Sequence, residues 1–471
     1  MNIQLSEHFT YRKLLRFTLP SMVMMVFTSI YGVVDGIFIS NFVGSDPFAA
    51  INLIMPFLMI LGALGFMLGS GGSALVGYYL GMRQEKRANE IFSLLVYVLL
   101  GVGALLTVLG LLFLEPVARL LGADADLLPY CVRYARIVLL GLVPFTLQNV
   151  FQSFLVTAER PHFGLYITVG AGVTNMVLDA LLVGVIPLGV EGAAIATVLS
   201  QCVGGILPLV YFARPNTSRL RLTRTRWELR PVLKSAANGS SEFMTNISMS
   251  IVSMLYNTQL MRWAGEDGVS AYGVLMYVSM IFMAIFIGYC VGSSPIVSYH
   301  YGAENKQELR GLRKKGLVIL SVTAIAMFLA GELAARPLAK LFVGYDEALL
   351  NITVHAFAIF SFSFLLSGFS IFGSSFFTAL GDGLTSALIS FLRTLVFQVA
   401  AVLIFPQLWG LDGIWFSIVA AEVMSVLVTA IFLLAKQRRY GKNPVGEAIS
   451  PTGFFLAQDK KRFCSVRTIE T

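Results

Sequence analysis

The chain has 471 residues, of which 56% are hydrophobic and 13% are charged, and its mean hydropathy is +0.77. These values exclude an ordinary soluble globular protein and are typical of a chain that crosses a membrane many times. The net charge of +8 comes without interleaved aromatic residues, and the four cysteines include no CxxC pair, so nucleic-acid binding, a disulfide framework and a zinc site are not predicted.

Apolar runs long enough to cross a bilayer as helices follow one another along the chain. The sequence predicts an all-α polytopic membrane protein with twelve transmembrane helices, at residues 15–41, 50–80, 89–115, 127–156, 161–186, 189–213, 235–263, 271–302, 312–335, 346–379, 383–406 and 410–436. The first run is too long for the apolar core of a signal peptide, so we expect it to be retained as a span.

Most of the 34 lysines and arginines fall in alternate loops and in the tail. By the positive-inside rule these segments are cytoplasmic, which predicts that both termini lie inside the cell. The longest internal polar stretch then divides the chain into an amino-terminal six-helix lobe (1–213), a basic cytoplasmic linker (214–234), a carboxy-terminal six-helix lobe (235–436) and a cytoplasmic tail (437–471).

The two halves of the chain repeat at an offset of 221 residues. Gly44 then aligns with Gly265, Pro116 aligns with Pro337, and FQSFLVTA aligns with FGSSFFTA. Six spans in each half give both halves the same orientation. The repeat therefore predicts two pseudo-symmetric lobes, related by an axis along the membrane normal, around a central cavity.

Two aspartates, Asp35 and Asp179, lie inside predicted spans. A carboxylate at such a depth costs at least ~2.5 kcal/mol and is usually functional. Tyr31 and Asn175 each precede one of these acids by one helical turn, and Thr197 reaches a similar depth on another span. These oxygens suit a Na⁺ ion, whereas a buried carboxyl can instead carry a proton; the plain alternative is that each aspartate only hydrogen-bonds a neighbouring helix.

The repeat favours an ion site in one lobe only. At the 221-residue offset Asp35 aligns with Tyr256 and Asp179 aligns with Ala400. If the acids served only the fold, both lobes should keep them. The sequence therefore predicts that the amino-terminal lobe alone binds the coupling ion.

These features resemble the MATE (multidrug and toxic compound extrusion) family over essentially the whole chain, and we favour its MepA-like bacterial branch. The matching features are the two six-span lobes, Pro20 in span 1, the phrases VVDGIFIS and GVEGAAIAT, and the pairs Tyr31/Asp35 and Asn175/Asp179. The resemblance implies cation coupling at Asp35, Asn175, Asp179 and Thr197, with Tyr31 beside them, in a protein of the bacterial cytoplasmic (inner) membrane. Pro20 marks a candidate helix bend.

The carboxy-terminal lobe has charged residues of its own. Arg393 paired with Glu422 or with Glu242 could form a buried structural ion pair. Glu242 also lies in the polar run NGSSEFMTN, where a cationic substrate could enter, so a role in substrate binding or coupling is the alternative for it. Met and aromatic side chains adapt to varied flat cations. Further candidates for substrate binding or gating, which could equally be packing or lipid-facing residues, are Asn257, Met55, Met276, Met280 and Phe282.

The expected function is secondary active multidrug efflux: a monomer that exports cationic amphipathic compounds in exchange for Na⁺ or H⁺. No enzymatic activity and no cofactor beyond the coupling cation are expected, because the sequence has no HExxH, P-loop or GxSxG pattern. Partners are small-molecule substrates and the lipid bilayer, with no nucleic acid. The alternatives are a flippase of lipid-linked precursors, which would want a basic cavity, an exporter of one physiological metabolite, and a channel or sensor.

Overall fold

The computed structural model describes residues 3–344 and 346–437, and these form helices without strands. The predicted tail, apart from its first residue, lies outside the described residues. The helices are α1 Tyr11–Phe42, α2 Ser45–Gly81, α3 Glu85–Leu120, α4 Leu128–Leu140, α5 Leu142–Thr157, α6 Pro161–Asp179, η1 Ala180–Val185, α7 Gly189–Ala213, α8 Leu229–Asn238, α9 Ser240–Gly302, α10 Lys306–Val343, α11 Glu347–Phe360, η2 Ser361–Ser363, α12 Phe364–Ala379, α13 Gly383–Phe391, η3 Leu392–Val396 and α14 Phe397–Ala435.

Within the described residues the helices account for twelve spans. Nine helices are long and apolar enough to cross a membrane, or ten when the bent pair α4 and α5 is counted as one span. Two of these contain non-helical breaks. Helix α9 is broken at Gly265, and the continuous stretch α13–η3–α14 is broken at Trp409–Gly410. Each break divides one long helix into two spans, so the twelve-span all-α prediction is confirmed.

Three predicted spans differ from the observed helices. The run 127–156 is not one straight helix, because α4 and α5 meet at Gly141 with a bend of 56°. The run 346–379 is interrupted by the 3₁₀ turn η2. The span expected to begin at residue 235 begins at Ser240, because residues 229–238 form the separate helix α8. Apolar runs locate spans well but do not register such breaks.

The backbone repeats the duplication seen in the sequence. Left-handed φ angles occur at Gly44 and Gly265 (114° and 64°), and again at Gly189 and Gly410 (63° and 58°). The non-glycine pair Arg83 and Glu304 has φ angles of 60° and 56°. Each pair is separated by 221 residues, so equivalent turns of the two halves share unusual conformations.

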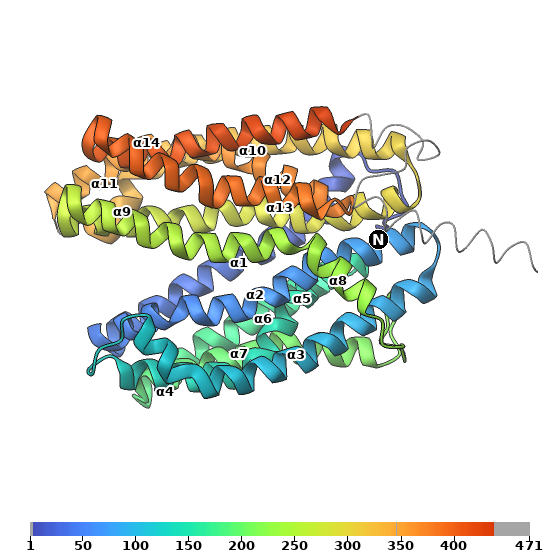
Figure 1. Cartoon of the computed structure of the whole chain (residues 1–471), viewed down its shortest axis with the longest axis horizontal. Coiled ribbons are helices and arrows are strands. Elements are labelled where there is room, and N and C mark those ends of the chain that lie inside the picture. The colour runs from blue at the N-terminus through green and yellow to red at the C-terminus, as the bar shows by residue number, and fades with distance from the viewer. Residues whose placement is uncertain (1–2, 345, 438–471) are drawn as a thin grey trace, which may run out of the picture.

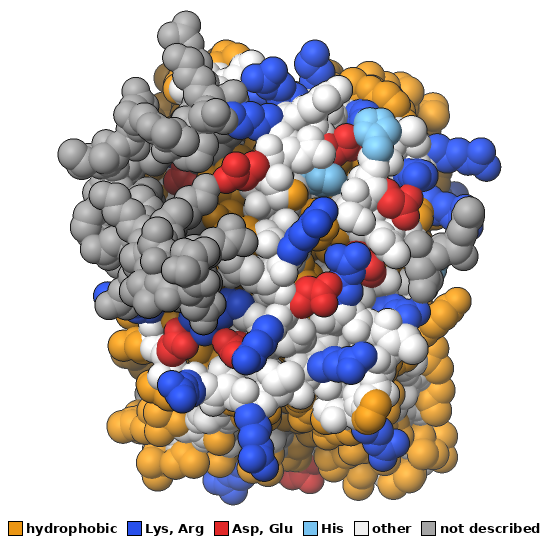
Figure 2. Space-filling model, turned by 90° about the vertical axis from the view of Figure 1, so that its right-hand side faces the viewer, with side chains coloured by type: hydrophobic (Ala, Val, Ile, Leu, Met, Phe, Trp, Pro, Cys, Tyr) orange, Lys and Arg blue, Asp and Glu red, His pale blue; other side chains and the backbone are white. Residues whose placement is uncertain are grey.

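The two halves form two lobes that touch at one end of the bundle. In Figure 1, α1–α7 and α9–α14 lie together at the end that carries the N-terminus and diverge towards the other end. Backbones meet closely at this junction, where a Cβ on Gly81 would overlap the Tyr299 carbonyl and a Cβ on Gly302 would overlap the Tyr78 carbonyl. We call this end the basic end. It holds the N-terminal segment, the linker, and the turns at 82–84 and 303–305, and lysine and arginine side chains gather over it (Figure 2).

The segment before α1 bridges the two lobes at the basic end. The Leu5 amide donates to Glu159 Oε1 of the amino-terminal lobe at 2.8 Å. The Phe9 amide donates to Glu308 Oε1 of the carboxy-terminal lobe at 3.0 Å, and Lys315 Nζ donates to the Phe9 carbonyl. Leu5 and Phe9 are fully buried, so this segment is part of the contact between the lobes.

Candidate functional site

Asp35 and Asp179 come from two helices that pack against each other, α1 and α6. Asp179 is the last residue of α6, and the helix continues directly as the π-helical segment η1. Segments of this kind are rare and frequently mark functional sites. Asp179 is fully buried and Asn175, one turn earlier, is 2% exposed.

The structure gathers four predicted site residues around unsatisfied oxygens. Asp35 interacts with both Asp179 and Asn175, and Thr197 joins them through a shared neighbour, Tyr134. Five buried oxygens of the four predicted residues have no hydrogen-bond partner: Asp35 Oδ1, Asn175 Oδ1, both Asp179 carboxylate oxygens and Thr197 Oγ1. Buried acceptors without partners are costly, so this group is poised to receive a cation or a proton.

Two further residues complete the site and were not predicted. Tyr134 on α4 is fully buried and lies near Asp35, Asp179 and Thr197, and its hydroxyl is also buried without a hydrogen-bond partner. Gln148 on α5 lies beside Tyr31, the predicted neighbour of Asp35. Their signal in the sequence is weak, since an uncharged tyrosine and an amide occur in many apolar spans.

One glycine allows the aromatic part of the site to form. A Cβ on Gly172 of α6 would lie 2.7 Å from Tyr31 Cδ1, closer than non-bonded carbon atoms can approach. Tyr31 therefore packs against a helix surface that only glycine leaves open. Gly172 lies one turn before Asn175, so close α1–α6 packing and the polar cluster occur at the same level.

The chemistry of the cluster fits a hard monovalent cation or a proton. Carboxylate, amide and hydroxyl oxygens are ligands of hard cations, and a cation lowers the cost of two neighbouring buried carboxylates. No group of three or more His, Cys, Asp and Glu side chains able to hold a metal occurs in the part of the chain that the structure describes. The donors present thus suit a transported ion better than a resident transition metal.

The equivalent position of the carboxy-terminal lobe is satisfied. Tyr256, which aligns with Asp35, donates its hydroxyl hydrogen bond to Gln398 Oε1 at 2.7 Å and lies 2.8 Å from Ser417 Oγ. Its ring stacks on Tyr272 at a centroid distance of 5.4 Å. The neutral, hydrogen-bonded set in one lobe contrasts with the unsatisfied acidic set in the other. That the amino-terminal lobe alone binds an ion stays a prediction.

Arg393 and Glu422 form a buried ion pair in the carboxy-terminal lobe, with Nη2 and Oε1 3.0 Å apart. Arg393 belongs to the π-helical segment η3.

Glu242 does not pair with Arg393, although both lie near the buried thiol of Cys290. Its role in substrate binding stays a prediction. Glu332 on α10 was overlooked in the sequence; its Oε1 is buried without a partner.

The candidate substrate residues lie on α2 (Met55) and on α9. Phe282 packs against Phe364 at 4.9 Å between centroids, and the Met280 carbonyl accepts a hydrogen bond from Ser29 of the opposite lobe at 3.4 Å. Asn257 is exposed, whereas Met55 and Met276 are half-buried. Pro20 lies within α1, which is assigned as one continuous helix. Substrate contact and a bend at Pro20 both remain predictions.

Two pseudo-symmetric six-span lobes, with acidic residues buried deep in one of them, are typical of the architecture of membrane transporters built from repeats. The family model MatE matches residues 20–181 and 243–404, one segment in each lobe. The chain belongs to the MatE family, and it is a multi-pass membrane protein.

Relatives and solved structures agree with this assignment over nearly full length. The chain is 24% identical to the multidrug export protein MepA of Staphylococcus saprophyticus, over 90% of this chain and 93% of the relative. It is 23% identical to MepA of Staphylococcus haemolyticus, over 92% and 95%. The outward-facing structure of a multidrug resistance MATE family transporter of the MOP superfamily superimposes with a TM-score of 0.88 at 24% identity, covering 94% and 99% of the two chains. At this identity the structural likeness shows the shared fold.

Proposed function

We propose that this protein is a secondary active multidrug efflux antiporter, which exports cationic amphipathic compounds in exchange for Na⁺ or H⁺. The observation that carries the proposal is the group of five unpartnered buried oxygens on Asp35, Asn175, Asp179 and Thr197. The similarity to multidrug export proteins supports the direction of transport and the class of substrate.

The arrangement of the lobes suggests how an ion and a drug are exchanged. By the positive-inside rule the basic end faces the cytoplasm, so the lobes are packed on the cytoplasmic side and diverge towards the outside (Figure 1). The ion then enters from outside and binds between α1 and α6. This favours one packing of α1 within its lobe and thereby reshapes the space between the lobes.

Coupling requires that ion and drug each weaken the binding of the other. Linkage makes the two effects equal: the factor by which the ion lowers drug affinity is also the factor by which the drug lowers ion affinity. Asp35 and Asp179 suit this role, because a bound cation or proton removes most of the electrostatic cost of holding two carboxylates together. The carboxy-terminal lobe, with its neutral Tyr256 network, contributes no second copy of the ion site.

Ethidium efflux from energised cells tests the proposal. Wild type, Asp35→Asn and Asp179→Asn are compared while a Na⁺ gradient and a pH gradient are imposed separately, with Glu332→Gln as the matched intramembrane carboxylate of the other lobe. We expect both aspartate variants to lose efflux at normal expression while Glu332→Gln stays active. The gradient that drives efflux in the wild type shows which ion is coupled.

Other outcomes favour other functions. If both aspartate variants pump normally, the acids are structural and the coupling mechanism is wrong. If wild type moves no cationic dye, a flippase of lipid-linked precursors or an exporter of one metabolite becomes the better reading.

A further inference from the structure

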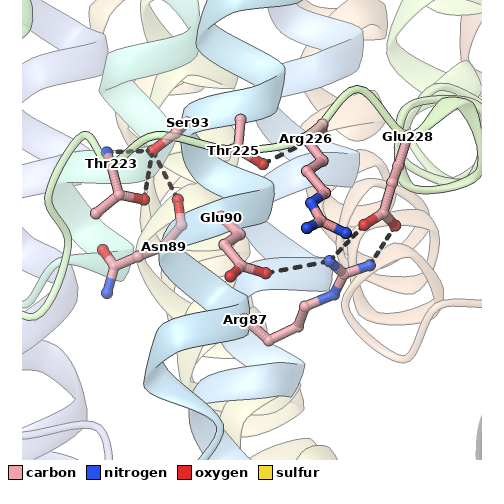
Figure 3. A network of polar contacts seen from close by, with 8 residues as sticks. All are labelled: Arg87, Asn89, Glu90, Ser93, Thr223, Thr225, Arg226 and Glu228. Atoms are coloured by element: carbon pink, nitrogen blue, oxygen red, sulfur yellow. Dashed lines mark hydrogen bonds and ion pairs between the residues drawn. The ribbon is translucent and has the colours of Figure 1, made fainter.

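The linker between the lobes is fixed along α3 at two places. The Arg87 guanidinium holds the Glu228 carboxylate with two hydrogen bonds, of 2.9 Å and 2.5 Å, and also contacts Glu90 at 3.2 Å. Further along α3, Asn89 Oδ1 accepts from the Arg221 amide at 2.6 Å, and Ser93 Oγ accepts from the Thr223 amide at 2.8 Å. Figure 3 shows both attachments along one helix. Residues 219–228 are thus held in place along the surface of α3.

This attachment engages Glu228, the acidic residue of the linker, and leaves two of the linker arginines exposed without an acidic partner among the described residues. Glu228 is bound by Arg87, a residue of α3. Arg224 and Arg230 are exposed, and within the described part of the chain neither forms an ion pair. An excess of positive charge therefore remains on the outer side of the linker.

Helix α8 adds an apolar stripe to these arginines. One side of α8 packs against both lobes: Ser235 and Asn238 are buried, and Asn238 Nδ2 donates to the Thr378 carbonyl at 2.8 Å. On the other side, Leu229 and Leu233 follow each other by one turn and are 54% and 58% exposed, and Trp227 just before them is 71% exposed. We call Arg224, Trp227, Leu229, Arg230 and Leu233 the linker surface.

The linker surface continues into the apolar side of α3. The Tyr97 hydroxyl donates to the Thr223 carbonyl at 3.4 Å, and Tyr97 itself is 44% exposed. Beyond it on the same helix, Val102 and Leu105 are 39% and 57% exposed, as expected of a lipid-facing helix. Tyrosine and tryptophan side chains are typical of the headgroup level of a bilayer. The linker surface therefore lies where the lipid-facing belt ends.

We propose that the linker surface binds an anionic phospholipid. Arg224 and Arg230 face the headgroup phosphate, while Leu229, Leu233 and the Trp227 ring lie against the upper acyl chains. An amphipathic helix with an apolar stripe and flanking arginines is the usual form of an interfacial membrane anchor. Each such arginine is expected to raise the local preference for an anionic over a zwitterionic lipid by a factor of about five.

Quenching of Trp227 fluorescence by brominated lipids tests this proposal directly. The chain has four tryptophans, and the Trp227 contribution is the difference between the wild type and Trp227→Phe. Protein in nanodiscs of mixed phosphatidylcholine and phosphatidylglycerol is measured twice, with one lipid or the other brominated at the same mole fraction. Brominated phosphatidylglycerol should quench Trp227 more strongly.

A matched pair of double variants separates a built site from general charge attraction. Arg224→Gln/Arg230→Gln should reduce the preference for phosphatidylglycerol at Trp227 by about 25-fold, the product of two factors of about five. Arg12→Gln/Arg16→Gln, which removes two exposed arginines of α1 near the same end, should leave it unchanged. The proposal is overturned if neither lipid quenches Trp227, if both quench it equally in the wild type, or if the two double variants lose the preference equally. None of these results depends on transport activity.

Discussion

Removal of the Phe9 side chain should loosen the packing of the lobes at the basic end. The ring is fully buried and contacts two aromatic rings edge-on: Phe17 of α1 at 6.0 Å and His300 of α9 at 6.4 Å between centroids. Since His300 belongs to the opposite lobe, about half of these contacts exist only while the lobes are packed together. Phe9→Ala should therefore act on the equilibrium between packed and separated lobes.

The size of the effect follows from the burial. Truncation of a buried phenylalanine to alanine typically costs about 3–5 kcal/mol. If half of that is specific to the packed state, roughly 2 kcal/mol is lost from it, which raises the population of the separated state roughly 30-fold.

A single cysteine at Ser298 reports this population. Ser298 is fully buried at the contact between α9 and α2, where its side chain fills the space beside Gly77. With the four native cysteines replaced by alanine, the rate at which Ser298→Cys reacts with a maleimide should rise by about the same factor in Phe9→Ala. Phe92→Ala is the control, because Phe92 is equally buried but packs within one lobe. An unchanged labelling rate in folded Phe9→Ala protein, or an equal increase in Phe92→Ala, would refute the reasoning.

Three further predictions concern other parts of the molecule. Gly172→Val should displace Phe27 and Tyr31, whose rings lie against this glycine, and reduce ion-coupled ethidium efflux without loss of expression, whereas unchanged efflux would show that this packing of α1 on α6 is not needed for the site. Arg393→Gln should lower stability by about 3–5 kcal/mol because Glu422 is left buried and unpaired, and Arg393→Met/Glu422→Leu should recover most of it in thermal denaturation. The hydrogen bonds from Arg87 hold the pKa of Glu228 below its ordinary value of 4.5. The stability that these hydrogen bonds give the linker is therefore complete above pH 4.5 and is lost as the pH falls through the lowered pKa of Glu228. Limited proteolysis of the linker should accelerate only below pH 4.5. Equal proteolysis rates above and below pH 4.5 would contradict this.

The sequence identified the parts of the molecule that carry a strong physical signal. Asp35 and Asp179 are costly in an apolar span, so their positions alone indicated a site, and the structure places them together. The 221-residue repeat is visible in paired residues such as Gly44 and Gly265, and the backbone reproduces it. The lengths of the apolar runs predicted twelve spans. This works because a span must pair its backbone groups within itself, so it forms a helix whose length in residues matches the bilayer.

The sequence did not identify features that depend on three-dimensional contact. Tyr134 lies beside the candidate site on α4, which is bent relative to α5 and packs beside α7, and no local pattern in the sequence marks that contact. Helix α8 was divided between the predicted linker, which ended at residue 234, and the span predicted to begin at residue 235, because the break at Gly239 has no strong signal in the apolar pattern. The π-helical turns after Asp179 and around Arg393 have no signature in composition, although both lie at polar positions inside the bundle.

The central claim is that ion binding at Asp35 and Asp179 and drug binding are coupled. The most direct measurement is ethidium binding to the purified protein, followed by fluorescence while Na⁺ is varied at fixed pH and then while pH is varied without Na⁺. In the wild type the coupling ion should weaken ethidium binding, and Asp179→Asn should bind ethidium with an affinity that no longer responds to that ion. A wild-type affinity that is independent of both ions, or an ion response that persists in Asp179→Asn, would contradict the account.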